Sequence, residues 1–213
     1  MFFPIKDENP TRRFAWMTLT LILTNVAFFV WQLTSAAPGQ LVLDWGFVPV
    51  AHGGDRIAAL FTSMFLHGGL LHLGSNMLYL WIFGNNIEDT LGPFTFLAFY
   101  LGSGLLGHLG HGLSDPSSAL PTIGASGAVA GVLAAYLLRF PRANVFCALV
   151  LFVIIRVVRV PAALVIGIWG LMQVVNGAIA VAGGPDGGVA WFEHIGGFVG
   201  GLGIFWLLQR MTR

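Results

Sequence analysis

A single serine, Ser126, stands among small residues in the stretch TIGASGAVAG, residues 122–131. An apolar run, 129–138, follows it and ends at Arg139, so the serine lies at the start of a predicted membrane helix. A serine hydroxyl becomes an activated nucleophile when a neighbouring base accepts its proton. Alone, such a serine is more typical of helix packing through small residues. The assignment therefore depends on the other polar residues at the same depth.

His194 is the histidine best placed to act as that base. It opens the last apolar run, in FEHIGGFVGG, and the predicted topology makes this run parallel to the one that Ser126 opens. Both runs carry glycines four apart, which lets two helix backbones approach closely. These glycine pairs are Gly127/Gly131, Gly196/Gly200 and Gly197/Gly201. We therefore expect the Ser126 hydroxyl within hydrogen-bonding reach of the His194 imidazole.

Donors for an oxyanion are expected from the stretch HGGLLHLGSN, residues 67–76. His72 and Asn76 are four residues apart and so share one face of a helix. With the backbone N–H of Ser126 they would form a three-donor cradle for the oxyanion of an acyl-transfer reaction. His67, five residues before His72, points elsewhere and is expected to brace the outer loop.

A third catalytic acid is not evident, so the sequence predicts a dyad. Asp186 and Glu193 are interpreted as loop residues, and Glu193 adjoins His194 without facing the same way. His108 and His111 are spaced i,i+3, but two ligands are too few for a zinc site. We interpret them as an interfacial pair and expect neither a metal nor another cofactor.

The composition predicts a protein built for the lipid bilayer. The chain has 213 residues, of which 56% are hydrophobic and only 9% charged, against about 25% charged in a typical soluble domain. A net charge of +1 offers nothing for nucleic acid to bind. We expect one membrane domain over residues 1–213.

Six transmembrane helices of an all-α bundle are predicted from the uncharged runs, because a span needs roughly 20 apolar residues. All Lys and Arg residues except Arg56 fall on the side of both termini, which the positive-inside bias makes cytoplasmic. Loop one, 34–61, is expected on the membrane surface, and residues 145–159 are interpreted as an interfacial stretch. Glu88 is expected to cap the turn into the third span. The predicted spans are 14–33, 66–83, 93–108, 126–138, 161–181 and 191–209.

The fourth predicted span is too short to cross the bilayer. Its 13 residues cover roughly 20 Å at about 1.5 Å per residue, whereas the hydrocarbon core is about 30 Å thick. If Arg139 marks the cytoplasmic face, Ser126 lies below the outer face. Non-helical backbone at that depth has to line a wet cavity or be buried in protein. We therefore predict a water-filled depression with Ser126 at its base.

These motifs together resemble the rhomboid family of intramembrane serine proteases over about residues 14–209. The four matching motifs are Gly124-Ala125-Ser126-Gly127, His194-Ile195-Gly196-Gly197, the set His67, His72 and Asn76, and the pair Glu88 and Gly92. The resemblance implies six spans with both termini inside, Ser126 as nucleophile, His194 as general base, and His72 with Asn76 as oxyanion donors. It implies that the substrates are single-pass membrane proteins, admitted sideways past the fifth span. It assigns supporting roles to His67, Gly124, Gly127, Glu88 and Arg56.

Three positions depart from the family pattern. Asp55-Arg56 stands where the family often has Trp-Arg, so that a structural anchor of loop one is half lost. Ala130 stands where many members carry an aromatic residue that stacks on the catalytic histidine. Glu193 stands where the residue before the base is usually Ala.

Two other functions are open to the same sequence. One is a catalytically silent rhomboid-like protein that binds membrane clients, although both Ser126 and His194 are present. The other is a small transporter, which would usually show broken helices in paired halves, a pattern that we do not find. The absence of a targeting extension favours a prokaryotic plasma membrane. The sequence predicts neither the substrate nor the oligomeric state.

Overall fold

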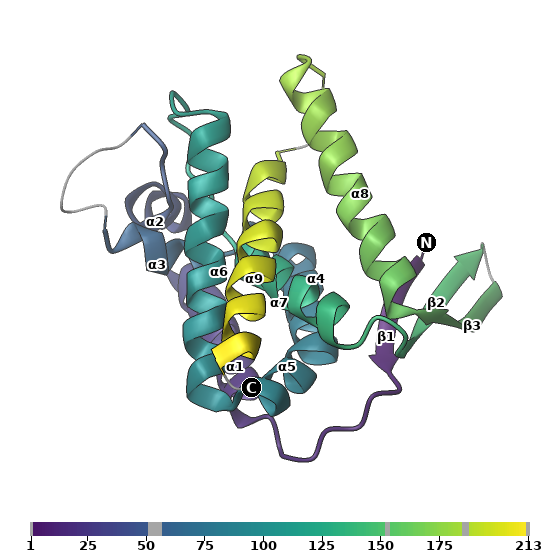
Figure 1. The fold of residues 1–213 in the computed structure, drawn as a ribbon. Coiled ribbons are helices and arrows are strands. Elements are labelled where there is room, and N and C mark those ends of the chain that lie inside the picture. The colour runs from purple at the N-terminus through teal and green to yellow at the C-terminus, as the bar shows by residue number, and fades with distance from the viewer. Residues whose placement is uncertain (1, 51–56, 152–153, 185–187, 212–213) are drawn as a thin grey trace.

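The computed structural model describes residues 2–50, 57–151, 154–184 and 188–211. The predictions at Asp55, Arg56 and Asp186 lie outside these residues. The fold is mainly helical, with a small sheet at one side (Figure 1). Its helices are α1 (Trp16–Thr34), α2 (Pro38–Trp45), α3 (Ala59–Thr62), α4 (Leu70–Tyr79), α5 (Asn85–Leu91), α6 (Pro93–Ser114), α7 (Ser126–Arg139), α8 (Ala162–Val181) and α9 (Trp191–Met211).

Three helices within the described residues are long and apolar enough to cross a membrane by themselves: α1, α8 and α9. They agree in extent with the first, fifth and sixth predicted spans. The chain is thus an integral membrane protein, while the count of six spans stays a prediction. The fourth predicted span is α7, whose 14 residues make it as short as expected. α6 extends the third predicted span to Ser114, with His108 and His111 in its last turns.

The second predicted span begins four residues later than expected. Ser63–Phe65 forms a 3₁₀ turn, and α4 starts only at Leu70, after Gly68 and Gly69. Glycine has the lowest helix propensity after proline, so two in a row favour a helix start beyond them. From Leu70 the chain stays helical through a π-helical turn, Leu80–Gly84, into α5.

The expectation of a purely helical fold is wrong on one side of the molecule. Strands β1 (Phe2–Asp7), β2 (Asn144–Leu151) and β3 (Ile154–Pro161) form an antiparallel sheet in the order β1-β2-β3. The predicted interfacial stretch 145–159 is thus a β-hairpin. The valines and isoleucines of this stretch favour a pleated, half-buried surface. Strand β2 also pairs with β1, which is far away in the sequence, so this pairing could not be predicted from local patterns. Because β3 ends where α8 begins, the sheet is fixed to the first turn of α8.

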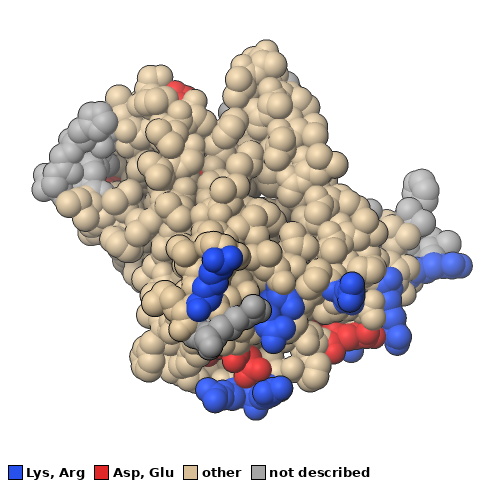
Figure 2. Space-filling model, viewed as in Figure 1, with Lys and Arg blue, Asp and Glu red and all other residues tan. Residues whose placement is uncertain are grey.

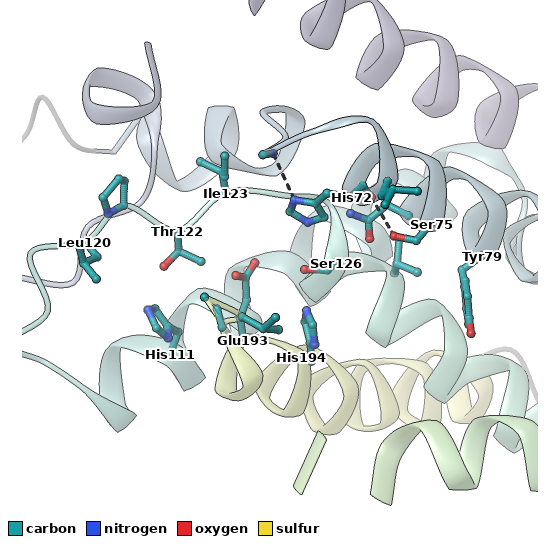
Figure 3. A pocket seen from close by; sticks show the side chains of 18 of the residues that line it. His72, Ser75, Tyr79, His111, Leu120, Thr122, Ile123, Ser126, Glu193 and His194 are labelled. Atoms are coloured by element: carbon teal, nitrogen blue, oxygen red, sulfur yellow. Dashed lines mark hydrogen bonds between the residues drawn. The ribbon is translucent and has the colours of Figure 1, made fainter. Parts of the chain in front are cut away.

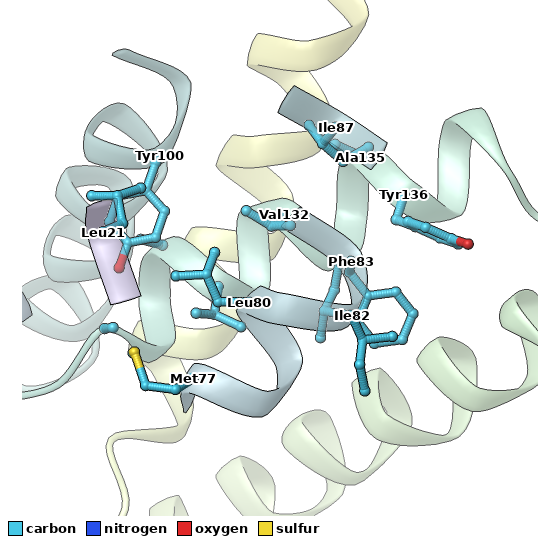
Figure 4. Packing of buried hydrophobic residues seen from close by; sticks show 14 of the residues in the cluster. Leu21, Met77, Leu80, Ile82, Phe83, Ile87, Tyr100, Val132, Ala135 and Tyr136 are labelled. Carbon is cyan, nitrogen blue, oxygen red and sulfur yellow. The ribbon is translucent and has the colours of Figure 1, made fainter. Parts of the chain in front are cut away.

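The core lies where the π-helical turn packs against α7 (Figure 4). Leu80 and Phe83 of that turn are fully buried, as are Val132 and Tyr136 of α7. The rings of Phe83 and Tyr136 meet edge to face with their centroids 4.9 Å apart. α7 is therefore the central helix of the bundle, which is consistent with its unbroken row of buried residues from Gly127 to Tyr136.

Glu88 caps a different helix from the one expected. Its carboxylate accepts hydrogen bonds from the backbone N–H of Met17 (2.9 Å) and from both the N–H and the hydroxyl of Thr18 (2.7 Å each). The first N–H groups of a helix have no partner within it, and the helix dipole favours a negative charge there. Glu88 therefore fixes the start of α1 to α5 and does not cap the turn into α6.

The positive charges gather at one end of the molecule. Figure 2 shows Lys and Arg side chains along the lower face, over the sheet and near the C-terminus, while the upper part is nearly free of them. α7 ends at Arg139, five residues before β2 of that sheet begins at Asn144. Ser126, at the opposite end of the same helix, therefore lies away from the charged face.

Candidate active site

A cavity of about 920 Å³ opens between α4, α6, α7, α8 and α9. The four residues expected to carry out the chemistry all line it, namely His72, Asn76, Ser126 and His194. Figure 3 shows these elements converging, with His72 above Ser126 and His194 below it in the view. The structure thus brings together side chains that lie up to 122 positions apart in the sequence (194 − 72).

Ser126 is the first residue of α7, and the turn before it places it next to His72. Gly124 has φ 125°, a left-handed conformation that side chains disfavour. A Cβ at this position would lie only 2.7 Å from His72 Nε2 and 3.7 Å from Ser126 Oγ. Gly124 is therefore required both by the backbone conformation and by the approach of the imidazole.

α7 and α9 touch through their backbones, as the glycine spacing predicted. A Cβ on Gly197 would fall on the carbonyl of Gly127, and one on Gly201 would fall on the Cα of Gly131. No side chain larger than hydrogen fits at these positions. The contact brings the first turns of α7 and α9 together at the cavity.

His194 projects into the cavity from the first turn of α9 (Figure 3). The hydrogen bond that the structure gives its ring is to α8, since Nδ1 lies 2.7 Å from Gln173 Oε1. Among the described hydrogen bonds none joins His194 to Ser126. The two residues line the same cavity, and the hydrogen bond expected between them stays a prediction.

Aromatic rings reach His194 from helices other than α7. Its ring centroid lies 5.9 Å from that of Trp169 on α8, with 32° between the ring planes, and 6.3 Å from that of Trp191. Ala130 is fully buried in α7. Tryptophans of α8 and α9 therefore lie next to the His194 ring, where the resemblance implied an aromatic residue at position 130 of α7.

His72 and Asn76 are arranged as hydrogen-bond donors. The N–H of Gly68 donates to His72 Nδ1 over 3.3 Å, so in the neutral ring the hydrogen is on Nε2. Nε2 is the atom that approaches Gly124 beside Ser126. Asn76 is buried, and its Nδ2 has no hydrogen-bond partner among the described residues. Each group thus has an N–H that none of the described hydrogen bonds uses, on a residue that lines the cavity.

His67 lies behind this pair and is held by α1. The side chain of Gln32 accepts from the His67 N–H (3.2 Å) and donates to its carbonyl (2.9 Å). The His67 ring meets that of His72 edge to face, with centroids 5.1 Å apart. His67 thus lies against α1 and His72, while its expected bracing of the outer loop stays a prediction.

The interpretation of Glu193 as a loop residue is wrong. Glu193 belongs to the first turn of α9 and is 1% exposed. Its side chain passes between Gly107 of α6 and Gly127 of α7. Its Oε1 lies 3.6 Å from His108 Nδ1, and no hydrogen bond to either carboxylate oxygen is found among the described residues. Glu193 and His194 both line the cavity, and the Glu193 side chain is directed at Gly127 and His108.

The interpretation of His108 and His111 as an interfacial pair is wrong for His108. His108 is 1% exposed, stacks on Phe47 with centroids 4.6 Å apart, and has its Nε2 3.0 Å from Ser63 Oγ. His111 lines the cavity. α6 extends past the predicted end at His108 to Ser114, and Phe47, Ser63 and Glu193 lie around the His108 ring.

The Rhomboid domain family matches this chain over residues 54–211. The chain belongs to the rhomboid family. Among its relatives is the yeast (Saccharomyces cerevisiae) mitochondrial Rhomboid protein 1, which is 33% identical over 135 residues, covering 61% of this chain and 38% of that protein. The rhomboid protease GluP of Bacillus subtilis is 40% identical over 78 residues, covering 37% of this chain and 15% of that protein.

A third relative is the mitochondrial RHOMBOID-like protein 6 of Arabidopsis thaliana, 28% identical over 170 residues, with 62% of this chain and 54% of that protein covered. The matched region thus spans little more than half of these relatives at most. Some relatives carry the word protease in their names and others do not. The comparisons therefore establish the family and leave the activity of this chain to be argued from the site.

From the sequence, Gln173 and Asn176 of the fifth span are expected either to line the cavity or to hydrogen-bond to a neighbouring helix, and the structure gives Gln173 a hydrogen bond to α9. The contact of Trp169 with the predicted base was not expected. Trp169 and Gln173 are four apart on α8 and so share a face of that helix, and both reach His194. That spacing was visible in the sequence. Their partner was not, because nothing in the chain indicates which helix this face packs against.

Proposed function

We propose that this rhomboid-family chain is an intramembrane serine endopeptidase that uses Ser126 and His194. The observation that carries the proposal is that one cavity holds a serine at a helix start, an imidazole and two free donors. The donors lie on α4, the serine on α7 and the imidazole on α9. A serine, a base and an oxyanion cradle are the three parts that acyl transfer requires.

In the proposed reaction, Ser126 Oγ attacks the carbonyl carbon of a substrate peptide bond while His194 Nε2 takes the hydroxyl proton. The carbonyl oxygen becomes an oxyanion, which accepts hydrogen bonds from His72 Nε2–H, Asn76 Nδ2–H and the Ser126 N–H. When the C–N bond breaks, His194 donates its proton to the leaving amine. A water molecule from the cavity, deprotonated by His194, then releases the acyl group from Ser126.

The substrates we propose are single-pass membrane proteins cut in or near their transmembrane segments. α7 is short, so Ser126 lies below the end of the longer neighbouring helices, and a peptide has to unwind into the cavity to reach it. We further propose that the basic face of Figure 2 is cytoplasmic, because positively charged loops are retained there. Both termini are then cytoplasmic.

The test is cleavage of a model transmembrane substrate in liposomes by the wild type, Ser126→Ala and His194→Ala. Ser75→Ala is the matched control, because Ser75 also lines the cavity but its hydroxyl donates to the His72 carbonyl in its own helix. We expect each of the first two changes to lower kcat by about 10³-fold or more, and the control to retain activity. A wild type that binds substrates without cutting them would indicate the client-binding function instead.

A further inference from the structure

We propose that Gln173 of α8 is the positioning residue for the general base, in the place that a carboxylate occupies in a Ser-His-Asp triad. The inference rests on the proposed function, because it assigns a role towards His194. Gln173 is 5% exposed, and its Oε1 lies 2.7 Å from His194 Nδ1. A buried amide on a membrane helix needs a reason, and this contact supplies it.

The orientation of the Gln173 amide follows from its second contact. Its Nε2 donates to the carbonyl of Trp169 over 2.9 Å, one helical turn earlier. A carbonyl oxygen only accepts hydrogen bonds, so the atom facing it has to be the amide nitrogen. The oxygen of the amide is therefore the atom directed at the His194 ring.

The tautomer of His194 follows in turn. An amide oxygen only accepts, so Nδ1 has to carry the hydrogen that it donates to Gln173. In a neutral imidazole the other nitrogen is then unprotonated. His194 Nε2 therefore presents a lone pair, which is the form that takes a proton from a serine hydroxyl. Gln173 selects the reactive tautomer and restrains the rotation of the ring.

The aromatic restraint on His194 comes from the same face of the same helix. Trp169 precedes Gln173 by one turn, lines the cavity, and places its ring within 5.9 Å of the imidazole at a shallow angle. α7 offers only Ala130 at the position where such a ring was expected. In this chain α8 supplies both the hydrogen bond and the ring that orient the base.

This arrangement couples the base to the position of α8. The buried residues of α8 are concentrated in its first turns, where Ala162, Val165 and Ile166 pack. Beyond them the inner face is formed by Trp169, Gln173 and Gly177, while residues such as Met172 and Val174 are exposed. If the outer half of α8 moves away from α9, Gln173 leaves Nδ1 and the base is no longer held in the reactive tautomer.

The test compares Gln173→Leu, which removes the acceptor, with Gln173→Glu, which keeps it. Asn176→Leu is the matched control, since it removes an amide from the next turn of the same helix. We expect Gln173→Leu to lower kcat by about 10- to 100-fold at unchanged KM, the size expected for one hydrogen bond to a group that becomes charged. Gln173→Glu and the control should stay within about threefold of wild type.

A second, independent measurement on the wild type is nitrogen-15 NMR of labelled histidine side chains. The signals of His194 are assigned as those that disappear in His194→Ala. We expect Nδ1 to be protonated in the wild type and Gln173→Leu to show both tautomers. A His194 proton on Nε2, or equal loss of kcat in Gln173→Leu and Gln173→Glu, would overturn the role of Gln173. A wild type that cleaves no substrate would instead contradict the proposed function, whatever the NMR shows.

Discussion

The helices that border the cavity are held in two different ways. α9 lies against α6 and α7 by direct backbone contact, and a Cβ at any of Gly196, Gly197, Gly200 or Gly201 would come closer than 3 Å to a neighbouring atom. On α8, by contrast, a Cβ added at Gly167 or Gly170 would have no atom of a neighbouring element within 4 Å. In Figure 1 the upper part of α8 stands apart from α9, and its lower end meets the sheet.

This difference separates the parts of the site by rigidity. Backbone contact leaves no side chain that can rotate to absorb a shift, so Ser126 and the backbone of His194 keep a fixed spacing. α8 is held by buried side chains in its first turns, here called its foot, and by a few side-chain contacts in its later turns. These contacts can be broken one at a time. The nucleophile and base are thus on the fixed part, and the group that orients the base is on the part that can move.

The largest effect is expected from breaking the backbone contact. In Gly201→Leu the new side chain would overlap the Gly131 backbone, so α7 and α9 would have to separate, and we expect little or no folded protein. Gly203→Leu is the matched control, because nothing lies within 4 Å of a Cβ there. Yield of monodisperse protein in detergent and its thermal unfolding measure both. Equal melting temperatures would show that the contact is not required.

A smaller loss is expected where α8 is anchored. Ile166 is 1% exposed in the second turn of α8, and truncating such a residue leaves a cavity. We expect Ile166→Ala to lower the free energy of unfolding by about 2–4 kcal/mol, measured by denaturant titration in detergent micelles. Ile168→Ala, at a position that is 49% exposed, should change it far less. Similar losses in both would contradict the assignment of the foot of α8 as its anchor.

The smallest effect is expected from the sheet below α8. Tyr136 donates its hydroxyl hydrogen to Asp7 Oδ2 over 2.6 Å, and burial raises the pKa of Asp7 above its ordinary value of 3.8. A raised pKa means that the folded state binds the proton more tightly than the unfolded state. The resulting stability is present below about pH 4 and is lost as the pH rises through the folded-state pKa.

Asp7→Asn should remove this part of the pH dependence, because an amide does not titrate in this range. The measurement is the melting temperature in detergent between about pH 4 and 7, with the exposed Asp44→Asn as the matched control. A wild type whose stability rises with pH across this window, with a slope that Asp7→Asn abolishes, would contradict a raised pKa for Asp7.

Much of the candidate site was predictable because its signals are local. The GxSG and HxxG motifs, and the spacing of His72 and Asn76, each place a residue on a known turn of one helix. The shortness of α7 follows from counting residues between Ser126 and Arg139. The partner of Gln173, the position of Glu193 and the β1–β2 pairing were not predicted, because each depends on a segment that is distant in the sequence and on a second helix or strand being in place.

The sequence by itself determined that the chain lies in a membrane and, to within two residues, where α1, α7, α8 and α9 begin and end. It also determined which faces carry glycine, because hydropathy and small-residue spacing act within single segments. Only the tertiary structure decided which group faces each nitrogen of His194, that Glu193 turns toward α6, and that the foot of α8 rests on a sheet. A hydrogen bond at 2.7 Å depends on the positions of two helices at once, and those positions are set by the packing of the whole bundle.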